Sequence, residues 1–99
     1  MTDINFTFKH IDPTEAIKSH ASKKIQKITK LEHEILDIHF IFEVDKLQHK
    51  AELIFQTNHG KFVSHHISES LYNSIDGAIE KMVHQISKDK DRHNSDKHH

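Results

Sequence analysis

Apolar and polar residues alternate along four short stretches of the chain, with the two-residue period of strands that bury one face. These stretches cover residues 4–8, 36–44, 51–55 and 61–67. The last two are separated by Asn58-His59-Gly60, a segment typical of a hairpin turn. The pattern therefore predicts four strands, and the short connections predict that the last three form an antiparallel meander.

Two longer segments have the 3.6-residue period of an amphipathic helix. The first follows Asp12-Pro13-Thr14-Glu15, which is typical of a helix start with Asp12 as the N-cap and Pro13 at the first helical position. Its apolar stripe predicts a helix to about residue 32. The second segment spans residues 69–92 and places these residues in one apolar arc: Leu71, Ile75, Ala78, Ile79, Met82 and Ile86.

The predicted order is β-α-β-β-β-α, which indicates an α+β fold of two layers: a four-stranded sheet with two helices on one face. The chain has 99 residues, enough for one domain, and we place that domain at residues 1–92. Residues 93–99 are rich in histidine and contain no apolar side chain, so they predict a flexible tail.

Basic residues form a separate stripe on each predicted helix. On the second helix the stripe comprises Lys81, His84, Lys88 and Arg92, and on the first it comprises Lys23, Lys27 and Lys30. If the helices lie side by side, the two stripes would line a common groove for a phosphate backbone, and the acidic flank of the second helix (Glu69, Asp76 and Glu80) would face away. The formal net charge of −1 therefore hides a local basic surface.

Several functional classes are disfavoured by what the sequence lacks. It has no cysteine, no recognisable signal peptide and no segment long enough to span a membrane, which predicts a cytoplasmic protein. No nucleophile with a base and an orienting group can be assembled, so we expect no enzyme activity and no cofactor.

Metal binding is the alternative that twelve histidines keep open. The segment His33-Glu34-Ile35-Leu36-Asp37 resembles a zinc-protease motif, but Asp37 stands where the second histidine is required, so a solvated helix end is favoured. His65 and His66 are adjacent in a predicted strand and would point to opposite faces. His93, His98 and His99 could bind a divalent ion weakly. We expect no structural metal site, and a histidine-rich metal-binding protein is retained as a rival hypothesis.

One family combines these features. The predicted element order and two sets of residues resemble the ribosome hibernation promoting factor and ribosome-associated inhibitor family, also called the sigma-54 modulation protein family, over residues 1–92. The first set is Thr14 to Lys18 with Lys24-Ile-Gln-Lys27-Ile, and the second is Leu71-Tyr72, Ile75-Asp76-Gly77, Ile79-Glu80-Lys81, Gln85-Ile86 and Lys88-Asp89-Lys90.

The resemblance implies a fold similar to double-stranded RNA-binding domains and a stress or stationary-phase protein that silences translation. Such a protein occupies the messenger and tRNA channel of the small ribosomal subunit and contacts its 16S rRNA. Short members act with a separate small ribosome modulation factor in forming ribosome dimers. The chain looks most like such a short member, and we expect it to be a monomer. A general double-stranded RNA-binding module, which would bind free duplexes as well, is a second rival.

By position, the resemblance implies that basic residues of both helices contact RNA. At position 84 the family usually carries arginine, so His84 loses a permanent charge and a bidentate phosphate contact. A histidine there predicts binding that strengthens on acidification. The predicted RNA-binding residues are Lys18, Lys23, Lys24, Lys27, Lys30, Lys81, His84, Lys88, Lys90 and Arg92.

Overall fold

The computed structural model of the chain describes residues 3–31 and 34–96, with side chains up to residue 90. Six elements follow the predicted order. They are β1 (Ile4–Lys9), α1 (Glu15–Thr29), β2 (Ile35–Asp45), β3 (Gln48–Thr57), β4 (Gly60–Ser68) and α2 (Leu71–Asp96).

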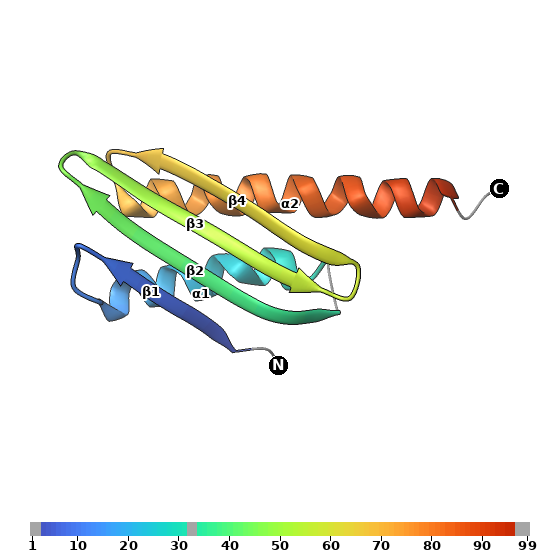
Figure 1. Ribbon diagram of the computed structural model, residues 1–99, viewed down its shortest axis with the longest axis horizontal. Coiled ribbons are helices and arrows are strands. Elements are labelled where there is room, and N and C mark those ends of the chain that lie inside the picture. Colours follow the sequence, from blue (N-terminus) through green and yellow to red (C-terminus); the bar gives the residue numbers. More distant parts are fainter. Residues whose placement is uncertain (1–2, 32–33, 97–99) are drawn as a thin grey trace.

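The four strands form one mixed sheet in the order β1-β2-β3-β4 (Figure 1). β1 runs parallel to β2 because α1 carries the chain back between them, and the pairs β2–β3 and β3–β4 are antiparallel. The predicted meander is therefore confirmed. Its last hairpin closes through Thr57, whose hydroxyl accepts from the His59 amide at 3.1 Å and donates to the Gly60 carbonyl at 3.0 Å. Gly60 has φ +147°, a conformation that favours glycine.

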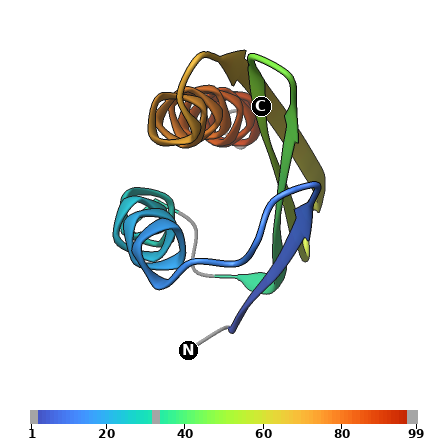
Figure 2. The same cartoon turned by 90° about the vertical axis from the view of Figure 1, so that its left-hand side faces the viewer.

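Both helices cover the same face of the sheet, as Figure 2 shows, so the predicted two-layer α+β arrangement is confirmed. The core lies between the layers, where alternate residues of the two central strands are almost fully buried. These residues are Ile38, Phe40 and Phe42 of β2 with Ala51, Leu53 and Phe55 of β3. They pack against the apolar arcs of the helices, which comprise Ile17, Ala21, Ile25 and Ile28 of α1 and Leu71, Ile75, Ala78, Ile79, Met82 and Ile86 of α2.

The boundaries of α1 differ from the prediction. The N-cap is Thr14, not Asp12, and its hydroxyl accepts from the Ile17 amide at 3.1 Å. Threonine and aspartate side chains can both accept from a free helix amide, and here Asp12 and Pro13 belong to the segment before the helix. The helix ends at Thr29 instead of near residue 32, with Lys30 as the C-cap.

α2 extends beyond the sheet (Figure 1) and continues to Asp96, past the predicted end of the domain at residue 92. Its last apolar residue is Ile86, and no glycine or proline follows that would end the helix earlier. Residues 97–99 of the predicted tail lie outside the described residues. Within the part of the chain that the structure describes, neither helix has an apolar run long enough to cross a bilayer.

The free edge of β4 is bonded to α2. The carbonyl of Val63 accepts from the Gln85 side chain at 2.8 Å, and that of His65 accepts from the Lys81 ammonium at 2.9 Å. On the adjacent residue, the Ser64 hydroxyl donates to the carbonyl of Ala78 at 2.8 Å. These bonds fix one side of α2 against β4.

Candidate nucleic-acid interface

The basic residues of α1 do not share one flank. Lys23, Lys27 and Lys30 are exposed, on the side of the helix away from its buried residues. Lys18 is half-buried and lies 4.0 Å from the Glu15 carboxylate. Residue 20 of α1 faces α2. Lys18 is two residues before it, which is a rotation of about 200° around the helix axis, so Lys18 lies on nearly the opposite side of α1. The structure therefore separates Lys18 from the other predicted contacts on this helix.

A carboxylate occupies the seam between the helices. Asp76 of α2 interacts with His20 of α1, with 2.9 Å between the His20 Nε2 and Asp76 Oδ1 atoms, and the Lys24 ammonium lies 4.0 Å from the same oxygen. Tyr72 meets the His20 ring edge-on, with 5.0 Å between the ring centroids. The prediction that the acidic flank of α2 faces away is wrong for Asp76. Periodicity places this residue beside the apolar arc, but it does not indicate on which side of α2 the other helix lies.

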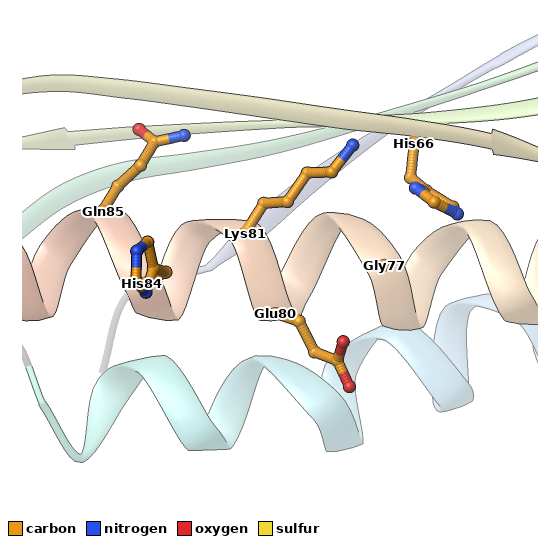
Figure 3. A pocket seen from close by; sticks show the side chains of 6 residues that line it. All are labelled: His66, Gly77, Glu80, Lys81, His84 and Gln85. Atoms are coloured by element: carbon orange, nitrogen blue, oxygen red, sulfur yellow. The ribbon is translucent and has the colours of Figure 1, made fainter.

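The predicted common groove is wrong for the same reason. Figure 3 shows Glu80 on the α1 side of α2, whereas Lys81 and Gln85 point toward β4. The basic stripe of α2 therefore lies on its outer and β4 side, and the stripe of α1 lies on the outer face of that helix. Asp76 and Glu80 stand between them, so the protein presents two basic strips instead of one groove.

The strip on α2 comprises three exposed residues, Lys81, His84 and Lys88. Lys90 is half-buried and lies at a different angle around the helix, about 200° further on than Lys88. The side chain of Arg92 lies outside the described residues. With Lys23, Lys27 and Lys30 on α1, these strips form the exposed basic surface on the helical side of the molecule.

A shallow groove of about 530 Å³ runs beside the α2 strip, between that helix and β4. Its lining residues are His66, Gly77, Glu80, Lys81, His84 and Gln85 (Figure 3). Sequence reasoning did not assign His66 to the site. The signal that points to it is Gly77, since a glycine inside a helix is about 1 kcal/mol less favourable than alanine and often marks a close approach.

The metal-site candidates are not brought together. Within residues 3–31 and 34–90, whose side chains the structure describes, no group of three metal-ligating side chains is arranged to hold an ion. His65 and His66 point to opposite faces of β4, as predicted, because their partners on β3 are Glu52 and the buried Ala51. The zinc-protease-like segment lies at the start of β2 and not at a helix end, with Glu34 and His59 paired at 3.0 Å. His33 lies outside the described residues.

Comparison with known proteins places these features in one family. The sequence model of the family described as sigma 54 modulation protein / S30EA ribosomal protein matches residues 4–94. A ribosome hibernation promoting factor from Escherichia coli K12 is 26% identical over 89 residues, which cover 90% of this chain and 94% of that protein. One from Pseudomonas putida is 26% identical over 92 residues, covering 93% of this chain and 90% of that protein.

Solved structures show the same fold. A ribosomal subunit interface protein from Coxiella burnetii superposes with a TM-score of 0.84 at 27% identity, covering 91% of this chain and 98% of that one. The N-terminal domain of Protein Y from Thermus thermophilus, at 18% identity, superposes with a TM-score of 0.79 over 87% of this chain and 97% of that domain.

Proposed function

Because this chain belongs to the family of sigma-54 modulation proteins and S30EA ribosomal proteins, a family of non-enzymatic ribosome-associated factors, we propose that it is a ribosome hibernation factor. In this proposal it binds the small ribosomal subunit in the channel for messenger RNA and tRNA. Translation then stops because the channel is sterically blocked.

The observation that carries the proposal is the exposed basic surface on the helical side of the molecule. Contacts of lysine with phosphates supply a large share of the affinity of proteins for nucleic acid, and they need no base recognition. The molecule is also long and narrow, with extents of 51 × 25 × 18 Å, and α2 projects from one end (Figure 1). This shape suits a channel lined by RNA.

The proposal includes the partners and the place of action. The protein acts as a cytoplasmic monomer on 16S rRNA, and a small ribosome modulation factor cooperates with it when inactive ribosomes pair. The basic strips of α1 and α2 (Lys23, Lys27 and Lys30; Lys81, His84 and Lys88) contact the RNA backbone, and Lys24 contributes from the seam. Lys18, Lys90 and Arg92 remain predicted contacts. Lys18 and Lys90 are half-buried, and the side chain of Arg92 is not among those that the structure describes.

Co-sedimentation with purified small ribosomal subunits tests this function. We expect saturable binding that weakens as salt increases, because bound counterions are displaced from the RNA. Messenger RNA and tRNA should displace the protein if it occupies their channel. Free double-stranded RNA is the control ligand: equally tight binding to duplexes would favour a general RNA-binding module, and no binding to subunits at low salt would overturn the proposal.

Replacing Asp76 by asparagine is expected to strengthen binding to the small subunit by about two- to threefold. The change removes a negative charge between the basic strips and frees Lys24, while the amide oxygen can still accept from His20. The same titration at fixed salt measures it. Glu52→Gln removes an equal charge from the opposite face of the sheet, and a similar gain in that variant would show that net charge alone is responsible.

A further inference from the structure

The groove between β4 and α2 is built around one histidine. His66 points to the helical side of the sheet, and a Cβ atom added at Gly77 would stand only 2.4 Å from the His66 Cγ atom. Any larger residue at position 77 would push the ring away. The glycine, which weakens a helix interior, therefore makes room for an imidazole in the wall of the groove.

His84 of α2 is a second histidine that lines the same groove, one helical turn after Lys81. His84 is exposed on α2, three residues after Lys81, whose ammonium keeps two hydrogens for other acceptors after bonding to the His65 carbonyl. Figure 3 shows His66, Lys81 and His84 around the groove, with Glu80 pointing toward α1. Imidazolium and ammonium groups spaced along one groove suit the phosphates of an RNA backbone.

Few other charges face these two histidines. On α2 they are Glu80, Lys81 and Lys88, and on β4 the residues that share the helical side with His66 are uncharged: Phe62, Ser64 and Ser68. The β3 residue opposite His66 is Ala51, and the titratable His49 lies two residues from Ala51 on the same face of β3. α1 lies on the other side of α2 (Figure 2). When both imidazoles are neutral, the charges of Glu80 and Lys81 in the groove lining cancel. When both imidazoles are protonated, the lining carries two positive charges.

We propose that this groove is a proton-gated site for an RNA phosphodiester, in which His66 and His84 carry the gate. Histidine is the side chain whose charge ordinarily changes between pH 5 and 8. Acidification converts a nearly neutral groove into a cationic one and tightens the hold on the ribosome. The proposal rests on the proposed function, and it extends the pH dependence predicted from His84 to a groove that includes His66.

The test compares dissociation constants for small ribosomal subunits at pH 6.0 and pH 7.5 at matched ionic strength. We expect the full chain to bind about tenfold more tightly at pH 6.0. In a His66→Gln/His84→Gln variant the ratio should fall below about two, since glutamine keeps hydrogen bonding without the charge. The matched control is His59→Gln/His65→Gln, which alters two histidines outside the groove and should keep the full ratio.

The outcomes separate the two proposals. Equal affinity at both pH values, or the same loss in the control variant, would overturn the gate while leaving ribosome binding intact. Absence of subunit binding at both pH values would overturn the proposed function itself.

A ribosome-free measurement then still tests the groove. We expect dimethyl phosphate, a phosphodiester of constant charge, to shift the imidazole NMR signals of His66 and His84 at pH 6.0, and those of His59 and His65 far less. Inorganic phosphate serves as the second probe. If inorganic phosphate shifts the signals of His66 and His84 more strongly than dimethyl phosphate does, the site is one for free phosphate and the phosphodiester proposal is overturned. Equal shifts at all four histidines would overturn the site.

Discussion

Replacing Lys81 and Lys88 together by glutamate is expected to weaken binding to the small ribosomal subunit by on the order of 100-fold at moderate salt. Both side chains are exposed on the outer and β4 side of α2, two helical turns apart. The variant loses two phosphate contacts and adds two repulsive charges. Titration over a range of salt concentrations measures the effect, and the dependence of log affinity on log salt should become shallower by about two contacts.

The control is Lys9→Glu/Lys61→Glu, which changes the net charge by the same amount. Lys9 of β1 and Lys61 of β4 are exposed on the face of the sheet opposite the helices. If the helical side is the interface, this variant should bind with nearly unchanged affinity. Equal weakening in both variants would show that binding responds to net charge, and unchanged binding in the Lys81/Lys88 variant would rule out the assigned strip.

Replacing Leu53 by alanine is expected to lower the free energy of unfolding by about 2–5 kcal/mol. Leu53 lies on the central strand β3, is 0% exposed, and pairs with Phe40 of β2. Truncation removes apolar contacts and leaves a cavity between the sheet and the helices. Because small domains are stabilised by only about 5–15 kcal/mol, the loss should be plain in urea-induced unfolding followed by circular dichroism.

Leu47→Ala is the matched control, since it makes the same chemical change at the tip of the β2–β3 hairpin. Leu47 is 83% exposed, so its truncation should change stability by less than about 0.5 kcal/mol. Comparable destabilisation in the two variants would contradict the assignment of the core to the space between the layers.

The sequence allowed the element order, the meander and the two-layer arrangement to be predicted, because each depends on periodicity and short connections. It also identified the helical core stripes, since residues such as Ile28 and Ile75 recur at 3.6-residue spacing. The ends of α1 were less predictable, because Asp12 and Thr14 can both cap a helix and the sequence pattern does not indicate which of the two does.

The candidate site was predicted residue by residue but not in its geometry. Which lysines are exposed follows from the helical wheel of each helix alone. How the two helices are rotated relative to one another depends on the tertiary packing, which placed Asp76 in the seam and turned Lys81 toward β4. His66 was missed because its role depends on a contact with Gly77 eleven residues away in the sequence.

The bonds from Gln85 and Lys81 to the free edge of β4 also affect how copies of this protein meet one another. An edge strand with unpaired carbonyl groups is a template on which another chain can add a strand. Here the carbonyls of Val63 and His65 are already bonded, so a second copy could extend the sheet at the β4 edge only by first displacing two side chains of α2. The same lysine that is proposed to face RNA thus also shields this edge of the sheet from strand addition.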